Sequence, residues 1–334
     1  MGSMKTAILI TSLALFLSSP SFSQDILQIE GTVELEQYFT RTQSITERDL
    51  ILSTVALAFL AQPNNQTKIM VSILYEEGYT PLEIDEAFIS YSLQNLPIEW
   101  LAGQIYLPFG NYHTAAINDP LTLQFAENRA TSLGLWYRKN SWEMATFAYT
   151  TEANNAQGSL SNFLVRVGKT WEIDETHLAI GVDMTNNLLQ GDGFDDFTDF
   201  KIEKLNGANI YLHWFSEKMF VHLEYVGSLE KGCFCTAQQT DVFQNYSSWH
   251  TEFGWFGHLL SKEIVTAFSI QGSHHLEVME LPKTRYLFSS SIEINENLAL
   301  AIEFSHDRNI GYFADDQTDY ANSDSLQIQL SAYF

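Results

Sequence analysis

Apolar and polar residues alternate along most of this chain with a period of two. In residues 29–36, apolar or small side chains hold every second position and Glu or Thr stands between them. Alternation of this kind predicts a β-strand with one apolar face. No long stretch has the 3.6-residue period of a helix, so we expect an all-β chain. The pattern recurs at 69–75, 87–93, 178–184, 219–225 and 298–304.

The alternation marks out candidate strands, each about as long as a strand that crosses a membrane at a tilt. We count sixteen of them, with a range of 14 to 18. Membrane barrels of this kind contain even numbers of strands, and sixteen fits that rule. They lie at 27–39, 49–60, 67–76, 84–93, 99–106, 130–138, 142–150, 162–171, 176–186, 206–215, 218–226, 248–258, 263–272, 284–294, 297–306 and 325–334.

The connections between these strands alternate in length. Short turns such as 63–66 and 139–141 take turns with long segments at 107–129, 187–205, 227–247 and 307–324. Short turns at one end and long loops at the other are typical of outer-membrane barrels. Aromatic residues such as Trp100 and Trp171 lie near strand ends, where ring side chains favour the lipid headgroup level. We therefore predict a transmembrane antiparallel up-and-down β-barrel in the bacterial outer membrane.

Both ends of the chain fit an exported barrel. Residues 1–23 combine Lys5, an apolar run at 7–17 and a Ser21-Phe-Ser cleavage pattern, which indicates a signal peptide. An N-terminal membrane anchor is the alternative. Residues 24–334 then form the barrel, and we expect no plug domain because the first strand begins almost at once. The final strand ends in Phe334, similar to the signal that the barrel assembly machinery recognises.

Charge narrows the function. Lys and Arg number 17 and Asp and Glu 41, for a net charge of −24, although only 17% of residues are charged. Nucleic-acid binding needs a cationic surface and is excluded. A lipid-facing wall must be uncharged, so the acid is expected in loops and lumen. Glu30, Glu34 and Glu36 share one face of the first strand, where an acidic wall would favour cations.

The segment 107–129 is the candidate constriction. Pro108, Gly110 and Pro120 fix sharp turns, and irregular backbone is tolerated at membrane depth where it lines a cavity. An ordinary surface loop is the alternative. The polar side chains that we expect to line the substrate path are Asn111, His113, Asp119, Glu127 and Arg129.

Residues 84–137 carry a family resemblance. Gly103-Gln, followed by Pro108-Phe-Gly at the end of a strand, resembles the phosphate-selective porins. With Asn111, the segment 119–122 and the segment 127–129, the longer pattern is similar to the LbtU-type siderophore porins of Legionella and related bacteria. This resemblance implies a barrel that takes up siderophores or small solutes. The chain lacks the Lys/Arg ladder expected of a phosphate-selective pore.

Other candidate chemistry is weaker. His222/Glu224 and His250/Glu252 form two His-x-Glu pairs on neighbouring strands, which suggests a weak metal site or simply polar lumen filler. Cys233 and Cys235 are candidates for a loop disulfide. Acidic clusters at 192–199 and 315–319 are either solvated loops or cation bridges to lipopolysaccharide. No catalytic motif occurs, so we expect neither an enzyme nor a cofactor.

Three functions remain open. The first is a porin that passes a small solute, plausibly a siderophore or ferric complex, by diffusion or facilitated diffusion. The second is a general cation-selective porin, favoured by the acidic wall because many siderophores are polycarboxylates. The third is an adhesion or structural surface barrel with a closed lumen. The expected partners are the solute, outer-membrane lipid and lipopolysaccharide, and the assembly machinery.

Overall fold

The computed structural model describes residues 27–43, 45–150, 160–189, 200–202, 204–232, 234–236, 243–314 and 317–334. In this part of the chain sixteen antiparallel strands close into a single barrel, and two short strands form a separate small sheet. The predicted all-β barrel is therefore confirmed, with its strand count. The predicted signal peptide and Cys233 lie outside the described residues. No described helix is long and apolar enough to cross a membrane.

The barrel strands follow the predicted segments closely, and each pairs with its neighbours around the wall. They are β1 (Leu27–Thr42), β2 (Ile45–Asn64), β3 (Thr67–Glu76), β4 (Thr80–Ser92), β5 (Ile98–Tyr106), β6 (Arg129–Lys139), β7 (Trp142–Tyr149), β8 (Asn162–Ile173), β9 (Thr176–Thr185), β11 (Gly207–Phe215), β12 (Met219–Ser228), β14 (Ser247–Leu259), β15 (Lys262–His274), β16 (Pro282–Asn295), β17 (Leu298–Ala314) and β18 (Gln317–Tyr333).

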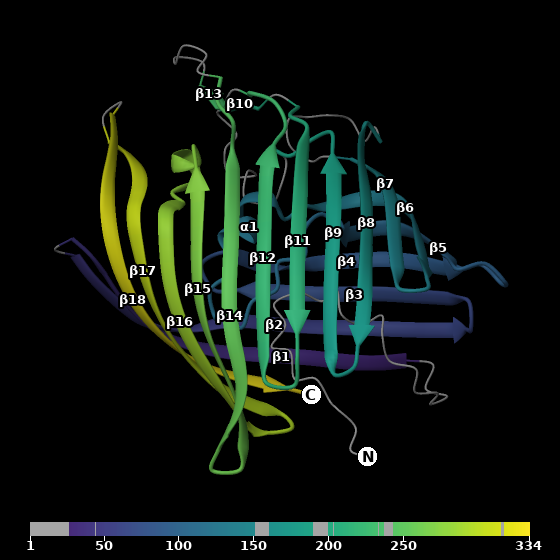
Figure 1. Cartoon of the computed structure of the whole chain (residues 1–334), viewed down its shortest axis with the longest axis horizontal. Coiled ribbons are helices and arrows are strands. Elements are labelled where there is room, and N and C mark those ends of the chain that lie inside the picture. Colours follow the sequence, from purple (N-terminus) through teal and green to yellow (C-terminus); the bar gives the residue numbers. More distant parts are fainter. Residues whose placement is uncertain are drawn as a thin grey trace.

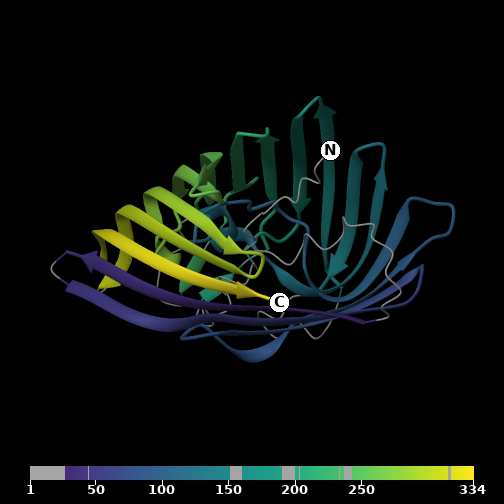
Figure 2. The ribbon, with the colours of Figure 1, turned by 90° about the horizontal axis from the view of Figure 1, so that it is seen from below.

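Figure 1 shows β8, β9, β11, β12 and β14 side by side across the near wall, with β1–β4 crossing behind them. Seen from below in Figure 2, the yellow β17–β18 hairpin lies beside the purple β1. The register agrees, since β1 pairs with β18 from Thr32 opposite Tyr333 to Thr42 opposite Ser323. The barrel closes where first and last strands meet.

The wall has one apolar and one polar face. Along β8, Phe163, Val165 and Val167 are exposed, whereas Leu164 and Arg166 between them are buried. Because successive side chains of a strand point to opposite sides of a sheet, the exposed apolar residues form the outer surface. A closed barrel with an apolar exterior and a partly polar interior is a membrane-spanning barrel.

Three of the long connections contain strands that we did not predict. The segment 307–324 was expected to be a loop, but β17 and β18 continue through most of it as a paired hairpin. The sequence does not reveal these extensions, because a strand that leaves the membrane no longer needs an apolar face. Arg308 and Asn309, which are exposed, interrupt the alternation there. In the loops at 187–205 and 227–247, β10 (Phe200–Ile202) pairs with β13 (Phe234–Thr236) in the small sheet.

Candidate functional site

The connection from β5 to β6, residues 107–128, runs through the barrel interior; we call it the inward loop. Its entry needs a glycine at two positions. Gly103 has a φ of +144°, and a Cβ there would lie 2.2 Å from the Ala87 carbonyl oxygen on β4. Gly110 has a φ of +86°, a left-handed conformation that favours glycine. The Gly103 and Pro108–Gly110 motif therefore redirects the chain from the wall into the lumen.

Four inward-facing carboxylates hold the inward loop; we call Asp183, Glu224, Glu252 and Glu303 the carboxylate ladder. Asp183 on β9 accepts from the Gly110 N–H at 2.8 Å. Glu224 on β12 accepts from the N–H groups of Asn111 and Tyr112 at 2.7 and 3.1 Å. Each carboxylate satisfies backbone donors that no strand can pair.

The ladder continues on β14 and β17. Glu252 on β14 accepts from the Thr114 hydroxyl at 2.8 Å and from the Ala115 N–H at 2.9 Å. Glu303 on β17 accepts from the Ile117 N–H at 2.6 Å. Gln271 on β15 adds a neutral acceptor for the N–H of Leu121 at 2.8 Å. The inward loop is thus fastened from β9 to β17 by side-chain acceptors.

Apolar packing reinforces the ladder on one side. The loop contains a helix, α1 (Leu121–Ala126), whose Leu121 and Phe125 are completely buried. This helix contacts β12, β14 and β15, and the buried core around it includes Phe147 and Leu164 from β7 and β8. The sequence predicted no helix here, because six residues are too short to display a helical period. We call this packed region the filled half of the lumen.

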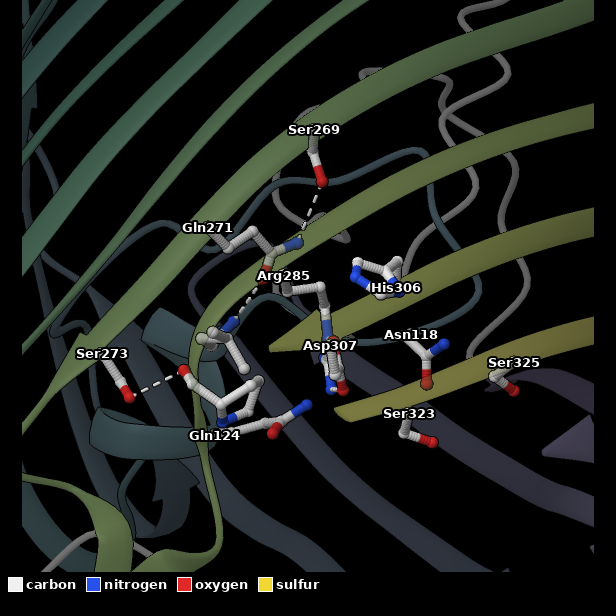
Figure 3. Close-up of polar contacts among 12 residues, drawn as sticks. Asn118, Gln124, Ser269, Gln271, Ser273, Arg285, His306, Asp307, Ser323 and Ser325 are labelled. Carbon is white, nitrogen blue, oxygen red and sulfur yellow. Dashed lines mark hydrogen bonds and ion pairs between the residues drawn. The ribbon is translucent and has the colours of Figure 1, made fainter. Parts of the chain in front are cut away.

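The opposite side of the lumen is polar. Among the described residues, the buried apolar cluster takes no side chain from β1–β3 or β16–β18. In Figure 3, Arg285 lies beside Asp307, bonded by its Nε and Nη2 at 2.7 and 2.8 Å, and Gln271 donates to Ser269 at 3.0 Å. Ser323 and Ser325 bond Thr42 and Thr40 on β1. We call the region along β16–β18 and β1–β3 the polar half.

The predicted constriction residues fall into two groups. Asn111, His113 and Asp119 lie on the inward loop, and Asn111 meets the ladder through its backbone N–H. Glu127 ends α1, where its N–H donates to the Leu123 carbonyl. Arg129 is the first residue of β6 and forms ion pairs with Glu83 at 2.6 Å and Asp85 at 3.1 Å on β4. All five thus lie in the inward loop or at its end, and their role in a constriction stays a prediction.

The histidines gather beneath the loop. The ring of His113 lies 4.8 Å from that of His213 on β11 and 5.7 Å from that of His222 on β12, measured between centroids. Burial lowers the pKa of His113 to about 4, which keeps this ring neutral at ordinary pH. The cluster therefore acts as uncharged packing between the inward loop and the wall.

The predicted metal site gains no support from the geometry. Glu224 and Glu252 are engaged by the inward loop, as the ladder shows. His250 lies 3.7 Å from Glu252, and His222 contacts other rings rather than converging with carboxylates. In the described part of the chain, no three His, Cys, Asp or Glu side chains are grouped so that they could hold a metal ion.

The predicted acidic wall follows the alternation of β1. Leu35 is exposed on the outer face, so Glu34 and Glu36 point inward, where both are half-buried. Glu34 accepts from the Ser331 hydroxyl at 3.0 Å. Glu30 shares that face and is exposed. Sequence reasoning missed Asp183, Glu303 and Arg166, although their alternate positions on strands place them on the inner face.

The comparisons with known proteins match the architecture. The channel DcaP of Acinetobacter baumannii superimposes with a TM-score of 0.62 at 11% identity, covering 92% of this chain and 97% of that one. The anion-selective porin of Comamonas acidovorans gives a TM-score of 0.60 at 9% identity, with 92% and 99% covered. This chain has the fold of an outer-membrane porin. Together with its apolar exterior, that fold places the barrel in the bacterial outer membrane.

The proteins that resemble this chain in sequence are distant relatives. A UPF0422 protein of Legionella pneumophila strain Philadelphia 1 is 20% identical over 345 residues, covering 92% of this chain. The chain spans 63% of the length of that relative. No protein-family model matches. The expected resemblance to porins is therefore confirmed at the level of fold, and the LbtU-type assignment stays a prediction.

Proposed function

We propose that this barrel is a passive pore that admits small hydrophilic solutes through its polar half and disfavours anions. One observation carries the proposal: the buried apolar cluster around the inward loop takes side chains from β7, β8 and β12 and none from the described residues of β16–β18 or β1–β3. The loop meets β16 and β17 instead through hydrogen bonds, from the Ser289 hydroxyl to the Ala115 carbonyl and from the Ile117 N–H to Glu303, so the lumen narrows there while its surface stays polar.

Charge sets the preference. Glu34 and Glu36 on β1 and Glu76 on β3 face the polar half, and Arg285 there is neutralised by Asp307. Acidic walls favour cations, so we infer a cation-selective pore. The anion-selective Comamonas porin has the same fold, but fold does not transfer selectivity, which depends on the side chains that line each pore.

The finer substrate that we carry forward is a siderophore or ferric complex, as the family resemblance implies. The acidic wall restricts the choice of siderophore, because it would repel a strongly anionic complex. A neutral or cationic complex fits better than a polycarboxylate. A general cation-selective porin without a preferred ligand is the competing form of the same proposal.

Planar bilayers test both levels. Folded, purified chain is expected to give discrete conductance steps, with a reversal potential in a KCl gradient that shows cations passing more readily than anions. Ferric complexes of neutral and of polycarboxylate siderophores are then added in turn, and block of the ion current measures binding. Absence of any conductance from folded protein would overturn the pore, whereas conductance without block would remove only the siderophore.

A closed structural barrel is the second candidate. The apolar core between α1 and the wall, with Phe125 and Phe147 at 0% and 1% exposure, is the observation in its favour, because a packed lumen needs no solute. The same bilayer measurement decides between the two, since a closed barrel gives folded protein without conductance.

A further inference from the structure

Basic side chains gather on the outer surface at the long-loop end of neighbouring strands. Arg41 on β1, Arg48 on β2 and Arg308 on β17 are all exposed. Cross-strand register brings them together around β18 and β1: Arg41 lies opposite Asp324, and Arg48 lies opposite Phe39. We call Arg41, Arg48 and Arg308 the arginine row. Figure 2 shows β17, β18, β1 and β2 adjacent at this edge of the barrel.

The arginine row lies beside exposed apolar side chains of the outer surface. Phe39, two residues from Arg41 on the same face of β1, is 39% exposed, and Phe304 on β17 is 49% exposed. His306 lies between Phe304 and Arg308 on that face of β17, and its Nδ1 lies 2.6 Å from Asp324. A cation one step beyond exposed phenylalanines occupies the level of the lipid headgroups.

These arginines differ from the other cations of the chain. Arg166 and Arg285 lie in the interior and pair with Asp183 and Asp307. By contrast, no ion pair joins any member of the arginine row to another described residue, and Asp324, which lies opposite Arg41, is paired with His306. In a chain with 41 acidic and 17 basic residues, these three arginines on β17, β1 and β2 are free to bind an external anion.

We propose that the arginine row binds the phosphate groups of lipopolysaccharide in the outer leaflet. The planar guanidinium matches phosphate with two parallel hydrogen bonds, and several exposed cations near a membrane surface add their attraction for anionic headgroups. The long-loop end faces the cell exterior in barrels of this type, which is the side where this lipid resides. The adjacent phenylalanines would contact its acyl chains.

The test compares two triple variants of the full-length folded chain. Arg41→Ser/Arg48→Ser/Arg308→Ser removes the row, and Lys139→Ser/Lys218→Ser/Lys262→Ser removes the same charge at the short-turn end. Binding of bis-phosphorylated lipid A is measured by native mass spectrometry in neutral detergent. We expect the arginine variant to bind at least tenfold more weakly, because loss of even one of the three charge-assisted contacts implies about that factor, and the lysine variant to match the parent chain.

Additional arms separate the sources of the anion. Dephosphorylated lipid A is expected to bind the parent chain as weakly as lipid A binds the arginine variant, and millimolar inorganic phosphate is expected not to displace the lipid. Equal binding by both triple variants would overturn the proposal, as would full displacement by free phosphate. A change of oligomeric state confined to the arginine variant would also overturn it, because the row would then be a contact between two copies. Heat-modifiable gel mobility confirms that each variant has folded.

Discussion

The two halves of the lumen use the same wall in opposite ways. In the filled half, inward positions of β7 and β8 hold Ala145, Phe147 and Leu164, which belong to the same buried apolar cluster as α1. In the polar half, inward positions of β16–β18 hold buried hydroxyl groups such as Ser289, Ser305 and Ser331. Alternation alone dictates neither outcome. What differs is the part of the inward loop that each side meets: α1 contributes apolar side chains to the filled half, whereas residues 115–118 bond Ser289 and Glu303 through polar groups. One loop thus makes one side of the lumen an apolar core and leaves the other side polar.

Breaking the ladder is expected to have the largest effect on this division. In Glu224→Ala/Glu252→Ala, three backbone N–H groups of the loop and the hydroxyl groups of Thr114 and Thr122 lose their acceptors. Each unsatisfied buried donor costs about 1–3 kcal/mol, so the loop should leave its seat and water should enter the filled half. Single-channel conductance is expected to rise.

Two controls accompany the ladder variant. Glu224→Gln/Glu252→Gln keeps an acceptor oxygen at each site and should change conductance less, and Glu263→Ala alters an exposed acid at the short-turn end of β15. Unchanged conductance in the double alanine variant would show that the loop is held by its apolar side chains alone.

Emptying the core is the next largest perturbation. Phe125 is fully buried in α1, and truncation of a buried phenylalanine costs about 3–5 kcal/mol. Phe125→Ala should lower the thermal stability of the seated loop and make the open-channel current noisier. Phe268→Ala removes an equal side chain from the outer face of β15, where Phe268 is 43% exposed; a similar loss there would mean that α1 contributes no special stability.

Neutralising the acidic wall tests the polar half by itself. Glu34→Gln/Glu76→Gln removes two inward carboxylates, which bond Ser331 and Thr80 respectively. Cation preference should fall, and the reversal potential in a salt gradient should move towards zero without a change in thermal stability. Glu280→Gln, at an exposed site in the β15–β16 connection, is the matched control. An unaltered reversal potential would place the selective path elsewhere.

A pH effect at Asp119 is expected to be the smallest. Burial raises the pKa of this inward-loop residue to about 6, with further increases from Glu76 and Glu34. Because the pKa in the folded chain exceeds the ordinary value near 3.8, the folded state binds a proton more readily, and acid favours the seated loop between about pH 6 and pH 3.8. As pH falls through about 6, Asp119 takes up a proton and loses its negative charge, so the preference of the pore for cations should decline.

The variant Asp119→Asn isolates that proton. The reversal potential of this variant at pH 7.5 is expected to equal that of the parent chain at pH 5. In the variant itself, the reversal potential should change little between pH 7.5 and pH 5. A parent and variant with the same pH profile would assign the titration to another group.

The strands were predictable because lipid imposes a strict outward face. Ile302 and Phe304 must be apolar, so the alternation of β17 survives in the sequence, and Pro108, Gly110 and Pro120 indicated the inward loop. What periodicity cannot show is the partner of an inward side chain. Glu303 is legible as inward-facing, yet its bond to the Ile117 N–H joins residues 186 positions apart, and no local pattern encodes such a distance.

That span has a consequence for how the molecule matures. The loop emerges between the fifth and sixth wall strands, but its acceptors are spread from Asp183 to Glu303, most of them in the second half of the polypeptide. The final seam also waits for Phe334, whose N–H and carbonyl both pair with Gly31. Contacts between distant segments form late, and the seam joins residues farther apart in the chain than any contact of the ladder. The loop is thus expected to be fastened before the barrel closes, so that the lumen is already narrowed when its wall is completed.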